Sequence, residues 1–172
     1  MTRTVVIREA TEADWPGILA ALRPVAIAGD SYDWPADISD EALHAQWLEQ
    51  PGWTTVVAVE DESVLGVAGF GPNRIGRGAH VANASFVVTQ DAAGRGVGRA
   101  LGEHVVEAAT QAGFKAMQFN AVVSTNTRAI ALWESLGFTI VGTIPGAFAH
   151  PDHGDVALHV MHRVLEAGRA DR

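Results

Sequence analysis

Three glycines alternate with other residues in the segment Gly94-Arg95-Gly96-Val97-Gly98, and this segment constrains the fold more than any other part of the chain. Glycine leaves main-chain N–H groups uncovered and tolerates a left-handed backbone. The run before the segment, residues 84–88, is rich in β-forming side chains. Apolar residues recur at helical spacing after it, namely Val97, Leu101, Val105, Ala108 and Ala112. The sequence therefore predicts a strand, a tight loop and a helix.

The N-terminus of such a helix favours an anion, because unpaired N–H donors and the positive end of the helix dipole meet there. Arg95 and Arg99 add positive charges beside the loop. A Walker loop requires Lys and then Ser or Thr after its last glycine, whereas Gly98 is followed by Arg99 and Ala100. The dinucleotide fingerprint requires Gly or Ala where this chain has Arg99 or Leu101. Neither nucleotide-binding motif fits, so we expect a phosphate-bearing ligand that is bound by another kind of loop.

The loop resembles motif A of the GCN5-related N-acetyltransferases, Gln/Arg-x-x-Gly-x-Gly/Ala, whose loop cradles the pyrophosphate of acetyl-CoA. Gly96 and Gly98 occupy its two small-residue positions, while Ala93 stands in the Gln/Arg position. The missing side chain at Ala93 shifts more of the expected binding onto main-chain donors.

Residues 124–138 resemble motif B of the same family, with Asn126 before a helix and Gly137 after it. The polar residues at its start and Gly137 at its end are also ordinary helix caps. Trp133 stands where the family often has the tyrosine that protonates the leaving thiolate, and an indole N–H cannot do so.

The resemblance implies acetyl-CoA as the acyl donor, bound where two central strands splay apart behind the loop. The residues expected to contact it are Phe86, Val87, Val88, Gly94, Arg95, Gly96, Val97, Gly98, Arg99, Asn126 and Trp133. Free main-chain groups at residues 86–88 would pair with the pantetheine amides. A main-chain N–H near Val88 would polarise the thioester, which makes Val88 one candidate catalytic residue. Asn126 of motif B is the other candidate.

Residues 117–126 and 142–148 resemble the branch of the family that acts on azetidine-2-carboxylate and other proline-like amino acids. The resemblance gives Asn83 the role of holding the substrate and Asn120 the role of supporting it. From the residues alone, both strand asparagines look buried, and they pair with each other, with the main chain or with a ligand. Tyr32 and Trp34 lie in an unpatterned segment that either faces the substrate or packs into the core.

Composition limits the function classes. The chain has 172 residues, of which 48% are hydrophobic, which suits a single domain over residues 1–172. A net charge of −8 argues against nucleic acid or an anionic membrane as partner. The absence of cysteine excludes disulfides and catalytic thiols, and no signal peptide or membrane span is recognisable, so we expect a cytoplasmic protein. His150 and His153 lack a third ligand at metal-binding spacing, so no metal is expected.

The order of predicted elements favours an α/β (α+β) fold. We expect a mixed, mostly antiparallel central sheet of six to seven strands flanked by about four helices. The expected elements are a strand at 3–8, a helix opened by residues 11–14, a helix capped by Ser39, a hairpin of 53–60 and 64–71, strands at 79–88, 115–123, 139–143 and 155–164, a turn at Pro145-Gly146, and a frayed tail at 166–172.

The function that follows from the resemblance is N-acetylation of a small-molecule amine, an amino acid or a proline-like analogue, by direct attack on the thioester. Asp30, Asp33 or a water would take the proton of the ammonium ion, and the sequence does not select among them. The alternatives are a non-catalytic acetyl-CoA sensor and an acetyltransferase for protein N-termini or lysines. We leave the oligomeric state open, with a homodimer as one candidate.

Overall fold

The computed structural model describes residues 4–166, which form seven strands and four α-helices. The strands are β1 (Val6–Glu9), β2 (Thr54–Glu60), β3 (Ser63–Pro72), β4 (Val81–Val88), β5 (Ala116–Val123), β6 (Thr139–His150) and β7 (Gly154–Val164). The helices are α1 (Trp15–Ala28), α2 (Asp40–Leu48), α3 (Val97–Gln111) and α4 (Thr127–Ser135). Short 3-10 turns at Glu12–Asp14, Gly76–Gly78 and Gln90–Ala92 precede α1, β4 and α3.

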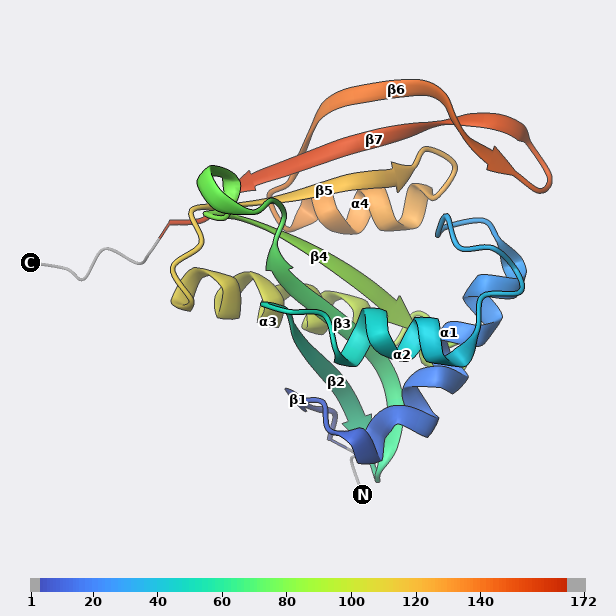
Figure 1. Ribbon diagram of the computed structural model, residues 1–172, viewed down its shortest axis with the longest axis vertical. Helices are drawn as coiled ribbons and strands as arrows, with labels where there is room; N and C mark the ends of the chain where they lie inside the picture. Colours follow the sequence, from blue (N-terminus) through green and yellow to red (C-terminus); the bar gives the residue numbers. More distant parts are fainter. Residues whose placement is uncertain (1–3, 167–172) are drawn as a thin grey trace, which may run out of the picture.

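The strands form one mixed sheet in the order β1-β2-β3-β4-β5-β7-β6 (Figure 1). Neighbouring strands run antiparallel, except for β4 and β5, which run parallel. Helix α3 connects this pair, because a parallel connection must carry the chain back along the sheet. The predicted fold, a mixed and mostly antiparallel sheet flanked by four helices, is confirmed.

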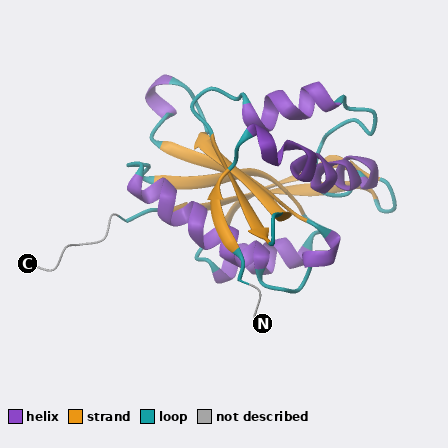
Figure 2. Ribbon diagram, turned by 90° about the horizontal axis from the view of Figure 1, so that it is seen from below, coloured by secondary structure: helices purple, strands orange, loops and turns teal. Residues whose placement is uncertain are grey.

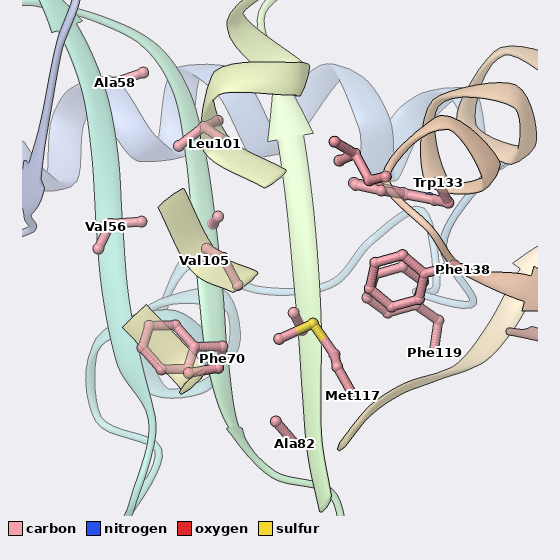
Figure 3. Close-up of a cluster of buried hydrophobic side chains, with 14 of the residues drawn as sticks. Val56, Ala58, Phe70, Ala82, Leu101, Val105, Met117, Phe119, Trp133 and Phe138 are labelled. Carbon is pink, nitrogen blue, oxygen red and sulfur yellow. The ribbon is translucent and has the colours of Figure 1, made fainter. Parts of the chain in front are cut away.

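Helices lie on both sides of the sheet (Figure 2). The larger core lies between the sheet and helices α3 and α4 and contains Leu101 and Trp133 (Figure 3). A second core lies between the sheet and helices α1 and α2 and contains Ile18 and Leu43, both fully buried. Strands β2, β3 and β4 send side chains into both cores, as expected for a sheet covered on both faces.

The first two helices begin at the caps that the sequence predicts. The Ser39 Oγ accepts a hydrogen bond from the main-chain N–H of residue 42 at 3.1 Å at the start of α2. Before α1, the Asp14 carboxylate accepts bonds from the N–H and the hydroxyl of Thr11 and forms a two-bond pair with the Arg8 guanidinium. The bond from Arg8 is the largest cause that holds the pKa of the Asp14 carboxyl well below its usual range. These bonds fasten β1 to the start of α1.

Helices α3 and α4 pack closely because α3 has a glycine at the contact. A Cβ at Gly102 would lie 2.6 Å from Leu136 Cδ1 and 3.1 Å from Trp133 Cζ3. Both distances are shorter than ordinary contacts, so the glycine permits the approach. This contact sets where α4 stands relative to the loop that precedes α3.

The structure departs from the predicted elements near the C-terminus. Strand β6 continues through Pro145-Gly146 instead of ending at Thr143. Gly146 has φ +59, and the pairing of β6 with β7 shifts between Ile144 and Phe148. The dipeptide is therefore an irregularity within a strand, which bends it without ending it. The tail predicted to fray lies, beyond residue 166, outside the described residues.

Within residues 4–166, no helix combines the length and the apolar character that a bilayer crossing requires.

Candidate active site

The sheet opens between β4 and β5. Within the described residues, these strands pair only at Val81 with Ala116 and at Ala82 with Met117, and their arrowheads point apart in Figure 1. A cavity of about 480 Å³ lies at this opening. Its walls come from β4, β5, α4, the β6–β7 hairpin and the connection between α1 and α2. The predicted site residues in these walls are Tyr32, Asn83, Phe86, Val87, Val88, Asn120, Asn126 and Trp133.

The main chain of β4 faces the cavity at every second residue. The Thr89 N–H donates to the Leu65 carbonyl at 2.9 Å, which fixes the phase of the antiparallel ladder with β3. The alternation of that ladder leaves the main-chain groups of Phe86 and Val88 directed towards β5. The expectation that Val87 also offers free main-chain groups is wrong, because its N–H and carbonyl face β3 and its side chain is buried in the second core.

The glycine loop has the open main chain that the sequence predicts. Gly94 and Gly96 have φ +78 and φ +80, a region that favours glycine, and a Cβ at either would meet no atom within 4 Å. Gly96 is the N-cap of α3, so the amides of residues 97–99 have no carbonyl of their own helix to bond. The Arg95 amide is different from the rest, because it donates to the Ala92 carbonyl at 3.2 Å. An anion at this end of α3 would meet several donors at once.

The two arginines beside the loop already have protein partners. The Arg95 Nη2 lies 2.7 Å from Glu60 Oε1, whose carboxylate is nearly buried. The Arg99 Nη2 donates to Ser135 Oγ at 2.7 Å, and its Nη1 lies 3.6 Å from Glu103 Oε1. Arg95 therefore ties the loop to the end of β2 and offers less charge to a phosphate than the sequence indicates. Arg99 remains half-exposed at the N-terminus of α3.

Asn126 has the capping role that the sequence predicts. Its Oδ1 accepts a hydrogen bond from the Ala129 N–H at 3.3 Å, and the side chain lines the cavity. Since the oxygen is used by the helix, the amide nitrogen is the donor that remains for a ligand.

Trp133 is part of the aromatic wall of the cavity. It is buried against the rings of Phe86 and Phe119, with ring centroids 4.6 Å and 4.9 Å away (Figure 3 shows Trp133 and Phe119). The side chain lines the cavity, as expected, but its N–H keeps its proton. A proton for the leaving thiolate must come from another group.

The two strand asparagines both line the cavity, but neither is buried: Asn83 is half-buried and Asn120 is exposed. Asn83 Oδ1 accepts from the N–H of Ala84 at 2.8 Å. Asn120 Nδ2 donates to Asn73 Oδ1 at 2.6 Å, and Asn120 Oδ1 accepts from Gln118 Nε2 at 2.9 Å. The expectation of buried side chains is wrong, because the recorded pairing of β4 with β5 ends at Ala82 and Met117 and the sheet is open beyond it.

Tyr32 reaches the cavity from the connection between α1 and α2. Its hydroxyl accepts from the Phe86 N–H at 2.9 Å and donates to the Phe86 carbonyl at 3.0 Å. Burial raises the pKa of this hydroxyl to about 12. Trp34 stacks on the Tyr32 ring at 4.3 Å between centroids and is buried in the second core. The predicted substrate contact of Trp34 is wrong, since it stands behind Tyr32 and is not among the residues that line the cavity.

Of the two carboxylates considered as a base, Asp33 lies in the cavity wall and Asp30 does not. The rings of His150, the last residue of β6, and His153, in the turn before β7, lie 4.6 Å apart. Across residues 4–166, no three His, Cys, Asp or Glu side chains gather as a metal ion would require.

Three contributors to the site are not predicted from the sequence. Glu60 anchors the loop through Arg95 across 35 residues, and Asn73 and Gln118 hold the Asn120 amide. Asn73 follows Pro72 and predicts nothing more than the end of a strand. Glu60 and Asn73 act over 35 and 47 residues, which no local pattern records, whereas Gln118 lies two residues before Asn120 on the same strand, a spacing that places both side chains on one face.

The fold agrees with comparisons against known proteins. The model of the Acetyltransferase (GNAT) family matches residues 16–138. A solved GCN5-related N-acetyltransferase from Kribbella flavida is 51% identical, with a TM-score of 0.90, and the match covers 94% of this chain and 98% of that one. A ribosomal-protein-alanine N-acetyltransferase from Brucella melitensis is 30% identical, with a TM-score of 0.83 and coverage of 93% and 99%.

A phosphinothricin acetyltransferase from Sinorhizobium meliloti, solved with acetyl-CoA, is 25% identical, with a TM-score of 0.83 and coverage of 100% and 93%. Among curated relatives, the N-acetyltransferase aca1 of Schizosaccharomyces pombe is 36% identical over 103 residues, which is 58% of this chain and 49% of that protein. The chain thus spans about half the length of that relative. The L-amino acid N-acyltransferase MnaT of Escherichia coli is 29% identical over 143 residues, 81% of this chain and 82% of that protein.

The family model covers more than half of the chain, and the predicted class of enzyme, an acetyltransferase, agrees with it. The chain belongs to the acetyltransferase (GNAT) family.

Proposed function

We propose that the protein transfers the acetyl group of acetyl-CoA directly to the amine of a small molecule, an amino acid or a proline-like analogue. The observation that carries this proposal is the opening between β4 and β5. Phe86 and Val88 lie in the wall of the cavity of about 480 Å³ at this opening, and a Cβ at Gly98 in the first turn of α3 would lie 3.6 Å from the Val88 side chain.

The donor half of the proposal rests on two sets of main-chain groups. The diphosphate of acetyl-CoA suits the uncovered loop at Gly94 and Gly96 and the first amides of α3. The pantetheine amides suit the edge of β4 at Phe86 and Val88, as an added strand would. The relative from Sinorhizobium meliloti was solved with acetyl-CoA, which supports the same donor here.

The acceptor half rests on the shape of the cavity. Tyr32 and Phe148 stand in its walls, and the asparagines Asn83 and Asn120 bring amide groups to it. Such a site suits a compact polar amine. The likeness to an L-amino acid N-acyltransferase supports an amino acid as that amine. The likeness to a ribosomal-protein-alanine N-acetyltransferase makes a protein N-terminus the second candidate acceptor.

The chemistry is attack by a neutral amine on the thioester carbonyl with both substrates bound. Holding the two reacting atoms together supplies most of the rate. A main-chain N–H of Phe86 or Val88 polarises the carbonyl. Asp33 or a water takes the proton that the ammonium ion must lose before attack. The chain has no cysteine, and no covalent acyl-enzyme is invoked.

The test is consumption of acetyl-CoA with a panel of amines: azetidine-2-carboxylate, a set of L-amino acids, and a peptide with an N-terminal alanine. Turnover with a small amine supports the proposal, and turnover with the peptide alone replaces the acceptor. Tight binding of acetyl-CoA without any amine-dependent turnover makes the protein a sensor. In the active case, Asn83→Ala raises the KM for the amine and leaves the KM for acetyl-CoA unchanged.

A further inference from the structure

The Tyr32 hydroxyl lies where β4 loses its partner strand. It bonds both main-chain groups of Phe86, at 2.9 Å to the nitrogen and 3.0 Å to the oxygen. These groups would pair with β5 if the two strands stayed together, but the pairing ends at Ala82. One phenol oxygen therefore satisfies a donor and an acceptor that would otherwise be unpaired in a partly buried position.

The same main-chain N–H is a natural partner for a thioester carbonyl. Phe86 lies in the cavity wall, and its N–H is directed towards the opening rather than towards β3. A carbonyl oxygen that accepts from this N–H must occupy nearly the place of the Tyr32 oxygen. The hydroxyl then has to shift by about one atomic diameter, and its O–H is free to donate to the newcomer.

We propose that Tyr32 is a catalytic hydrogen-bond donor, which donates its O–H to the thioester carbonyl oxygen while that oxygen also accepts the Phe86 N–H. This inference rests on the proposed function. It adds a side-chain donor to the main-chain donor, so that the oxygen is held by two donors as negative charge develops on it.

In the step itself, the amine nitrogen forms a bond to the carbonyl carbon and the C=O π pair moves onto the oxygen. The tetrahedral intermediate then reforms the C=O bond and breaks the C–S bond. The departing thiolate receives the proton that the amine nitrogen loses, directly or through water. Tyr32 donates a hydrogen bond throughout and keeps its proton.

The environment of Tyr32 suits a donor better than an acid. Burial is the largest cause that raises the pKa of the phenol to about 12, and hydrogen bonds with Phe86 and Ser85 act in the opposite direction. A phenol of that acidity stays neutral near pH 7 and gives up its proton less readily than a free tyrosine. The ring is also held in place by its stack on Trp34. Tyr32 is thus a fixed, neutral hydroxyl.

The first test is Tyr32→Phe, which removes the hydroxyl and keeps the stacked ring. We expect kcat to fall by about 100-fold, as for loss of one oxyanion donor in other enzymes, while the Kd of acetyl-CoA changes less than about threefold. Infrared spectra of bound acetyl-CoA labelled with ¹³C at the carbonyl give a readout that a structural role would not move. The carbonyl stretch shifts to lower frequency in the wild type, and this shift is smaller in Tyr32→Phe.

The second test uses the fact that the chain contains one tyrosine. Uniform labelling with 3-fluorotyrosine gives a single ¹⁹F resonance that reports on Tyr32 in the otherwise unchanged protein. We expect this resonance to move on addition of acetyl-CoA and to move much less with CoA, which has no carbonyl at the sulfur. This measurement decides the matter if Tyr32→Phe does not fold.

A wild-type kcat and carbonyl frequency in Tyr32→Phe would overturn the inference. Tighter binding of acetyl-CoA by this variant, with kcat unchanged, would also overturn it, because the Tyr32 hydroxyl would then only fill the site when acetyl-CoA is absent. Equal ¹⁹F shifts with acetyl-CoA and CoA also overturn it. Wild-type protein that turns over acetyl-CoA in these cases leaves the proposed function standing. Wild-type protein that fails to bind acetyl-CoA refutes both.

Discussion

Gly96→Glu tests whether the loop before α3 binds a phosphate group. Gly96 has φ +80, and a Cβ there would meet no atom within 4 Å, so the new side chain has room. A left-handed backbone costs a non-glycine residue roughly 1–2 kcal/mol. A carboxylate at a helix N-terminus recovers about 0.3–1 kcal/mol of this. We therefore expect a folded variant that is less stable than the wild type by about 1 kcal/mol.

The effect on donor affinity should be larger. At about 6 Å, one carboxylate repels one phosphate charge by roughly 0.7 kcal/mol in water and about 3 kcal/mol at an effective dielectric constant of 20. The Kd of acetyl-CoA should accordingly rise by about 3-fold to 100-fold. Because the repulsion acts between exposed charges, added salt should narrow the difference from the wild type.

The matched control is Gly113→Glu. Gly113 has φ +92, a Cβ there also meets nothing within 4 Å, and it follows the opposite end of the same helix. Gly113→Glu therefore imposes similar backbone strain, but its carboxylate lies a full helix away from the loop before α3. Calorimetric titration with acetyl-CoA should find weaker binding in Gly96→Glu and wild-type binding in Gly113→Glu. Unchanged affinity in Gly96→Glu, or an equal loss in the control, would refute the assignment of the loop.

Substitutions at three further positions test the rest of the site and its support. Asn126→Ala removes the cap of α4, so it should lower the free energy of unfolding by about 1 kcal/mol and also weaken acetyl-CoA binding. Asn126→Ser should restore the stability but not the binding. Recovery of both by serine would show that the amide group does not bind acetyl-CoA. Gly102→Val places a Cβ 2.6 Å from Leu136 Cδ1, so overpacking should lower the free energy of unfolding by about 1–3 kcal/mol; an unchanged thermal midpoint would contradict the packing. Asp14→Asn breaks the pair with Arg8 and should destabilise the protein at pH 7 by about 1–3 kcal/mol. Because the pKa of Asp14 is lowered in the folded state, its stabilisation is present above the ordinary value of 3.8 and is lost as the pH falls below it. Chemical denaturation should therefore show the gap between variant and wild type closing in acid, and a gap that stays constant from pH 7 to about pH 3 would be inconsistent with this pKa.

Local signals predicted most of the fold. Ser39 and Asn126 mark helix starts, and Gly137 marks a helix end with φ +85, because caps depend on the side chain at one position and a few neighbouring amides. The alternation of Ala84, Phe86 and Val87 between the two cores follows from strand geometry alone. Such features need no knowledge of the rest of the chain.

The parts that failed depend on contacts between distant segments. Trp34 packs behind Tyr32 because α2 offers it a second aromatic ring, that of Trp47. Asn120 is exposed because β4 and β5 separate, which its own strand pattern does not record. Arg95 is held by Glu60 at the end of β2, so its charge is partly used before any ligand arrives.

The two hydrogen bonds between the Tyr32 hydroxyl and the main chain of Phe86 also depend on a distant contact, since they join residues 54 positions apart. The sequence predicted that Tyr32 faces the site, but which backbone group the hydroxyl meets is set by the opening of the sheet. The chemistry of the acceptor pocket is therefore least visible in the sequence, while the donor loop is most visible.

We propose that the amides at the start of α3 bind the diphosphate of acetyl-CoA and place the thioester in the opening between β4 and β5. Isothermal titration calorimetry of the wild-type chain with acetyl-CoA tests it most directly. We expect saturable binding of one coenzyme per chain, which salt weakens and which CoA competes. No heat of binding across a range of temperatures, together with no shift in the unfolding midpoint, would contradict it.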